Sequence, residues 1–133
     1  MQLVVDTNVF AAAIIRKGDT RRLLFSGEHM LYSPERVRIE IARNAAEFMK
    51  KAGVSENEFN EIVELVFENI IIVPAGEYKG NKEEAKRLCP KNHEADWPFL
   101  GLALKLNCPL WTGDASLQEQ DKVKIITTKQ LIG

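Results

Sequence analysis

Five short apolar runs, several of them rich in β-branched residues, alternate along the chain with longer stretches in which apolar residues recur every three or four positions. The runs cover residues 3–5, 30–32, 70–73, 109–112 and 123–127. Strands that alternate with helices predict βαβ units and a parallel sheet with helices on both faces. We therefore expect an α/β fold with three layers, α/β/α, around a five-stranded parallel sheet.

The start of a predicted helix stands out after the second strand. Ser33-Pro34-Glu35 has the order of an N-cap, a proline in the first helical position and a first-turn acid. An apolar stripe then runs to Gly53, which predicts one long helix ending there. Ser55 and Glu58 match a capping box for the next helix.

The composition is that of an ordinary globular protein. The chain has 133 residues, 45% of them hydrophobic and 28% charged, so we expect residues 1–133 to form a single domain with its own core. No apolar run approaches the roughly 20 residues that a membrane-spanning helix needs. Cys89 and Cys108 form no C-x-x-C pair and follow no signal peptide, which predicts reduced thiols in a soluble, cytoplasmic protein.

The net charge of -1 provides no basic field over the whole molecule. Any contact with nucleic acid must therefore come from local clusters of basic residues, which more often belong to a solvated surface. The candidates are Arg16-Lys17, Arg21-Arg22, and Arg36 with Arg38.

Acidic residues follow two of the predicted strands directly: Asp6 ends the first strand and Asp114 follows the fourth. Parallel strands end at one edge, and ligands of open α/β sheets bind there. Asp96 begins a helix that is apolar nearly all round, and Glu40 borders the apolar stripe of an earlier helix, so the topology can bring both to that edge. Asp6, Asp96 and Asp114 also have a structural interpretation as helix caps.

Four acids at one edge of a sheet would repel one another strongly. Because no lysine or arginine stands in the same motifs, the cluster calls for cations. All-oxygen ligands favour Mg²⁺ or Mn²⁺ over zinc. One or two such ions activate water and stabilise the charge that develops on a phosphodiester.

At these residues the chain resembles the PIN-domain nucleases, and the resemblance covers essentially its whole length. It implies a five-stranded parallel sheet between helices, and Mg²⁺- or Mn²⁺-dependent cleavage of single-stranded RNA, often by the toxin half of a toxin–antitoxin pair. It also implies an antitoxin partner and a homodimer. The matching segments are residues 4–9 (Val-Val-Asp-Thr-Asn-Val), Ser33-Pro34-Glu35 with Glu40, Asp96 ahead of residues 98–104, and Thr112-Gly113-Asp114.

The resemblance also implies roles for individual residues. Asn8 and Thr112 are candidates for polar groups that support the metal ligands, and Glu94 can replace an acid that often accompanies the aspartate at the helix start. The positions that match the metal-binding and catalytic acids of the family are Asp6, Glu40, Asp96 and Asp114.

Two other classes of function stay open at this point. Haloacid-dehalogenase phosphatases and receiver domains also place an aspartate after the first strand and transfer phosphoryl groups through it. The D-x-D-x-T signature of those phosphatases is absent, because Asn8 replaces the second aspartate, and Asp114 lacks the lysine strand of a receiver. The third class is an RNA- or protein-binding module that keeps the fold without turnover.

Two residues near Asp96 have both a functional and a structural interpretation. Trp97 can stack on a base or pack against the core. His93 can assist proton transfer, although a single histidine in a loop is more often an ordinary surface residue.

Overall fold

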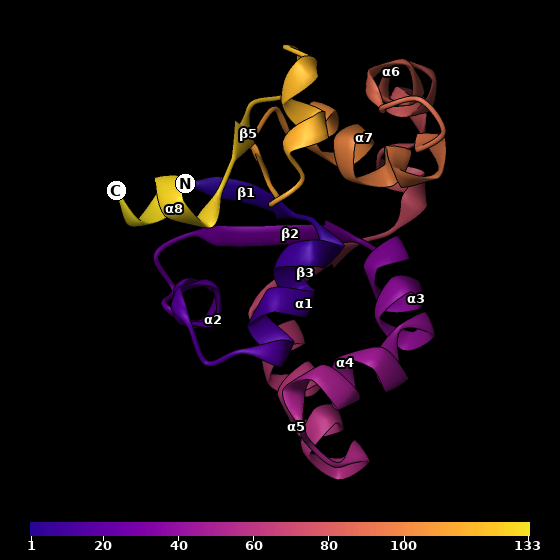
Figure 1. Ribbon diagram of the computed structural model, residues 1–133. Helices are drawn as coiled ribbons and strands as arrows, with labels where there is room; N and C mark the ends of the chain where they lie inside the picture. The colour runs from indigo at the N-terminus through magenta and orange to yellow at the C-terminus, as the bar shows by residue number, and fades with distance from the viewer.

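The computed structural model describes residues 1–133 and contains a five-stranded sheet with the strand order β3-β2-β1-β4-β5 (Figure 1). Each pair of neighbouring strands is parallel, which confirms the predicted fold class. The strands are β1 (Gln2–Val5), β2 (Met30–Pro34), β3 (Ile70–Val73), β4 (Leu110–Trp111) and β5 (Ile125–Ile126).

Helices cover both faces of this sheet. Figure 1 shows α6 and α7 on one side and α1 to α5 on the other. None of these helices combines the length and the hydropathy that a membrane crossing requires. The helices are α1 (Thr7–Ile15), α2 (Asp19–Phe25), α3 (Arg36–Arg43), α4 (Ala45–Ala52), α5 (Glu56–Glu68), α6 (Lys82–Leu88), α7 (Trp97–Leu106) and α8 (Thr128–Ile132). Single 3-10 turns cover Ala75–Glu77, Lys79–Asn81, Glu94–Asp96 and Ala115–Glu119.

The central strand β1 is buried on both faces, as its unbroken apolar run predicted. Leu3, Val4 and Val5 expose none of their surface and belong to one core of 27 buried hydrophobic residues. Helix α7 is buried from Pro98 to Ala103, in agreement with its apolar pattern. The core therefore holds β1 and α7 rigidly, together with the acids that adjoin them.

Helix α3 begins later than the sequence predicted. Ser33 and Pro34 belong to β2, and the helix starts at Arg36 without a side-chain cap. Ser33 is fully buried, and its Oγ donates to the carbonyl oxygen of Val5 at 2.9 Å, so its hydroxyl ties β2 to β1. Pro34 is the last residue of β2 and pairs with Val73 of β3. The backbone N–H of Glu35 donates to the carbonyl oxygen of Val73 at 3.3 Å, so the pairing of the two strands continues past the proline. The predicted N-cap at Ser33 is wrong for this tertiary reason.

The long helix predicted to run to Gly53 is broken at Asn44. This residue leaves the helical conformation with φ -106° and ψ 10°, and its Nδ2 donates to the carbonyl oxygen of Glu40 at 2.7 Å. Helix α3 therefore ends one turn after Glu40, and α4 starts in a new direction.

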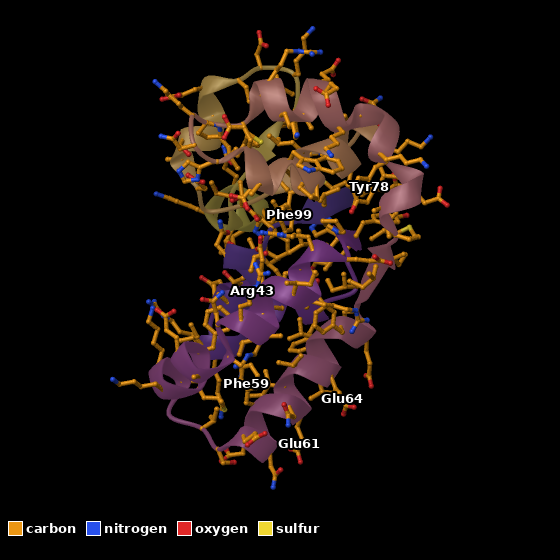
Figure 2. The ribbon with its side chains drawn as sticks, turned by 90° about the vertical axis from the view of Figure 1, so that its right-hand side faces the viewer. Arg43, Phe59, Glu61, Glu64, Tyr78 and Phe99 are labelled. Carbon is orange, nitrogen blue, oxygen red and sulfur yellow. The ribbon has the colours of Figure 1, made fainter.

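The next two predicted signals are confirmed. Gly53 ends α4 in the left-handed conformation, and Ser55 with Glu58 forms the capping box of α5. Figure 2 labels Phe59, Glu61 and Glu64 on α5, where Phe59 is buried and the two glutamates are exposed.

Candidate active site

Asp6 lies where β1 ends and α1 begins, at the carboxyl edge of the sheet. Its Oδ1 accepts the backbone N–H of Thr7 at 2.8 Å, so the predicted capping role is present. Its Oδ2 accepts the hydroxyl of Thr112 at 2.8 Å and the amide Nδ2 of Asn8 at 3.3 Å. Donors on α1 and after β4 thus hold this carboxylate in one orientation.

Thr112 and Asn8 form a hydrogen-bond network that joins the start of α1 to the end of β4. The buried Thr112 Oγ1 accepts from Asn8 Nδ2 at 2.9 Å and from the backbone N–H of Asp114 at 3.1 Å. Asn8 Oδ1 accepts the backbone N–H of Gly113 at 3.0 Å. The two residues predicted to support the acids therefore position Asp6 and the loop that carries Asp114.

Thr112→Val should destabilise the protein by about 1–3 kcal/mol, because the buried Asp6 carboxylate loses one of its donors and the backbone N–H of Asp114 loses its acceptor. Thr112→Ser is the matched control, since it keeps the hydroxyl, and it should lose clearly less. Urea unfolding measures both free energies of unfolding. A loss in Thr112→Ser that exceeds the loss in Thr112→Val would show that the methyl group, not the hydroxyl, matters at this position.

Glu40 approaches the same edge from α3, and Asp96 approaches it from the turn before α7. Thr7 Oγ1 donates to Glu40 Oε2, and Arg36 Nε donates to Glu40 Oε1 at 3.2 Å. Asp96 precedes α7 but makes no capping hydrogen bond with its side chain. The cap interpretation of Asp96 is therefore wrong, and its carboxylate is free to face the other acids.

Burial and neighbouring charges raise the pKa of two of these acids, Asp6 and Asp96. Burial is the main reason that the pKa of Asp6 rises to about 6; hydrogen bonds from Thr112 and Thr7 oppose the rise, and the charges of Asp96 and Glu40 add to it. The pKa of Asp96 is raised by burial and then by Glu40, while Arg36 and His93 lower it. The charge of Glu40 therefore acts on both aspartates, and bound protons or cations would reduce the repulsion among the three carboxylates.

Asp114 lies near these acids, but its carboxylate also accepts hydrogen bonds from a neighbouring residue in the chain. Its Oδ1 accepts the backbone N–H and the hydroxyl of Ser116, at 3.0 and 2.7 Å, and so caps the Ala115–Glu119 turn. Asp114 lines one narrow cavity of about 20 Å³ together with Asp6, Asp96, Cys89 and His93.

The surroundings of Trp97, His93 and Glu94 bear on the functional and structural interpretations of these residues near Asp96. The Trp97 ring packs 5.7 Å from the Tyr78 ring and near the amine of Lys82, which supports the packing interpretation. His93 Nδ1 lies 4.0 Å from Asp96 Oδ2, in contact range only for a weak ion pair. Glu94 is exposed in the turn before α7, outside the group of facing acids.

Arg36 and Thr7 belong to the site but were not among the predicted site residues. The premise that no arginine stands in the acidic motifs is wrong, because Arg36 lies four residues before Glu40 and pairs with it. The i, i+4 spacing on one helix was the signal that could have revealed this pair. Thr7 had no comparable signal, since its partner Glu40 is 33 positions away in the chain.

The donor chemistry of the site fits a hard divalent cation, although the side chains are not assembled around one. Carboxylate and hydroxyl oxygens dominate it, and Mg²⁺ and Mn²⁺ prefer such ligands. No three acidic, histidine or cysteine side chains lie close enough together to hold an ion as they stand. The carboxylate oxygens of Glu40 each accept a hydrogen bond, one from Arg36 and one from Thr7.

Asp96→Asn should leave the free energy of unfolding of the metal-free protein unchanged or raised, because it removes one of three mutually repelling charges and breaks no cap. Glu94→Gln, two positions earlier on an exposed side chain, is the control for loss of charge alone. Thermal unfolding in chelator measures the difference. Clear destabilisation by Asp96→Asn, with Glu94→Gln unaffected, would contradict this picture of the site.

Comparison with known proteins identifies the class of protein that this fold and acidic edge define. The sequence profile of the PIN domain matches residues 4–131, so the chain belongs to the PIN domain family. A comparison with curated protein sequences gives no match.

A solved structure supports the same fold. The chain is similar to one in the crystal structure of VapBC2 from Rickettsia felis bound to a DNA fragment from their promoter, with a TM-score of 0.69 and 14% sequence identity. The match covers 96% of this chain and 98% of that one. At this identity the likeness is one of fold.

Proposed function

We propose that the chain is an Mg²⁺- or Mn²⁺-dependent endoribonuclease that hydrolyses phosphodiester bonds of single-stranded RNA. The observation that carries the proposal is the approach of Asp6, Glu40 and Asp96 at the carboxyl edge of the sheet, where burial and then the charges of neighbouring acids raise the pKa values of Asp6 and Asp96. Such a concentration of acids is suited to a cation, and membership of the PIN domain family gives the class of chemistry.

The four acids have different parts in this proposal. Asp6 and Asp96 line the narrow cavity and would hold the ion together with Glu40, while Asp114 lines the same cavity and adds negative charge. Asn8 and Thr112 fix the Asp6 oxygens, so that the carboxylate needs little reorganisation. The bound ion would supply an activated water and would stabilise the charge that develops on the phosphodiester.

One alternative has a specific observation in its favour. Because no three candidate ligands are assembled for an ion in the structure, a PIN-like module that binds RNA or protein without turnover remains a second candidate. A phosphoryl-transfer enzyme is the weaker alternative, because both oxygens of Asp6 accept hydrogen bonds that restrain it as a nucleophile.

We extend the proposal to a toxin that acts in the cytoplasm, with an antitoxin protein as partner and a second copy of the chain in a homodimer. The support is the likeness of fold to the VapBC2 structure. A cavity of about 650 Å³ between the ends of α1 and α4, the start of α2, and α8 offers a surface for a protein partner. Its wall combines apolar Ile15 and Ile132 with basic Arg16, Lys51 and Lys129.

An assay with end-labelled RNA tests the proposed activity. The purified chain should cut single-stranded RNA in Mg²⁺ or Mn²⁺, and chelator should stop the reaction; double-stranded RNA and single-stranded DNA are the controls. If calorimetry shows that the ions bind but no RNA is cut, the result would favour the binding module. Covalent phosphate on Asp6 after exposure to a phosphodonor would favour phosphoryl transfer.

A further inference from the structure

Arg36 pairs with an acid of the candidate site and is only partly exposed to solvent. It is the first residue of α3, and its Nε donates to Glu40 Oε1 at 3.2 Å, one helical turn further along. The side chain of Arg36 is 31% exposed and that of Glu40 is 17% exposed. The charge of Arg36 also lowers the pKa of Asp96. The guanidinium therefore acts on two of the proposed metal ligands.

Each carboxylate oxygen of Glu40 accepts one hydrogen bond. Thr7 donates to Oε2 and Arg36 donates to Oε1. Each carboxylate oxygen keeps a second lone pair, so a divalent ion could bind Glu40 beside these donors, and the charge of the donor decides whether it stays. Arg36 is the donor that carries a positive charge, so the ion would repel it while leaving the neutral hydroxyl of Thr7 in place.

A guanidinium released from Glu40 would need another anion at the rim of the site. Arg36 reaches Glu40 through Nε only, which leaves its two terminal amino groups without a hydrogen bond to that carboxylate. The planar fork of a guanidinium is matched to two phosphate oxygens, and phosphate is the anion that RNA would bring to this edge.

We propose that Arg36 is a phosphate-binding residue of this site, which neutralises Glu40 while no metal is bound and moves to an RNA phosphate when a divalent ion takes Glu40. The inference rests on the proposed metal-dependent nuclease and adds a residue outside its four acids. Arg38 is the matched control, because it is on the same helix but its guanidinium lies 4.5 Å from the centre of the Phe67 ring.

Metal affinity without RNA is the first measurement. Calorimetry on the whole chain should show that Arg36→Gln binds Mn²⁺ about 2- to 5-fold more tightly than the unchanged protein, the size expected for one partly exposed ion pair. Arg38→Gln should bind Mn²⁺ with unchanged affinity. Equal or weaker Mn²⁺ binding by Arg36→Gln would overturn the proposal.

RNA affinity is the second measurement, by fluorescence anisotropy with a labelled single-stranded RNA that resists hydrolysis. Arg36→Gln should lose about 10-fold in affinity in Mn²⁺ and nothing in chelator, because Arg36 reaches phosphate only after Glu40 is taken. A loss of the same size in both conditions, or none in Mn²⁺, would refute the exchange.

Arg36→Lys is a second variant, for the case that Arg36→Gln does not fold. It keeps the charge but lacks the fork, so its Mn²⁺ affinity should stay near that of the unchanged protein while its RNA affinity in Mn²⁺ falls. Lysine that matched arginine in RNA binding would count against the proposal. Neither measurement depends on cleavage. A chain that hydrolyses no RNA would contradict the proposed nuclease activity, and the two affinities would still decide the role of Arg36.

Discussion

Asp6→Asn is expected to lower cleavage of single-stranded RNA by about 100-fold or more, since changes even in groups that only support metal ligands cost 10- to 100-fold. Asp6 ends the central strand, faces the cavity shared with Asp96 and Asp114, and carries the charge that a cation would neutralise. The amide is nearly isosteric and can still accept the N–H of Thr7, so the fold should persist.

The assay for Asp6→Asn uses end-labelled RNA in saturating Mg²⁺ or Mn²⁺, with circular dichroism to verify folding. Asp121→Asn, on an exposed side chain, is the control and should cleave at the unchanged rate. Chelation of the unchanged protein should mimic the Asp6 variant. Turnover at full rate by folded Asp6→Asn would refute the proposed role of this carboxylate.

The metal-free protein is expected to lose up to about 3 kcal/mol of stability through Asp6 as the pH rises from 4 to 7. The pKa of Asp6 is about 6 in the folded chain and near 3.8 when exposed, because burial disfavours the carboxylate. Between these values the folded state binds more protons than the unfolded state, so raising the pH favours unfolding. The penalty is absent below pH 3.8 and complete above pH 6.

Urea unfolding in chelator at several pH values measures this effect, and Asp6→Asn removes the titrating group. The free energy of unfolding of the variant minus that of the unchanged protein should therefore increase from pH 4 to pH 7. Acids that lie far from Asp6 titrate alike in both proteins and cancel in the difference. A difference that stays flat with pH would show that Asp6 is not held at a raised pKa.

Local patterns determined most of the fold in advance. The unbroken apolar run of β1 could be buried only on both faces, and alternation with amphipathic helices left a parallel sheet as the consistent arrangement. The capping box at Ser55 and the left-handed Gly53 were also correct, because each depends on atoms only a few residues apart. The sequence alone therefore predicted which strand ends carry Asp6 and Asp114.

Tertiary contacts decided the rest. Ser33 became a strand residue because a distant carbonyl of β1 accepts its hydroxyl, and Thr7 acquired a role because α3 brings Glu40 to it. Arg36 was predicted to be a surface cation, but in the folded chain it is the counter-ion of Glu40. A local pattern shows which residues can form a helix or a strand, but the protonation, pairing and availability of a carboxylate depend on charges and donors that only the folded chain brings within a few ångströms.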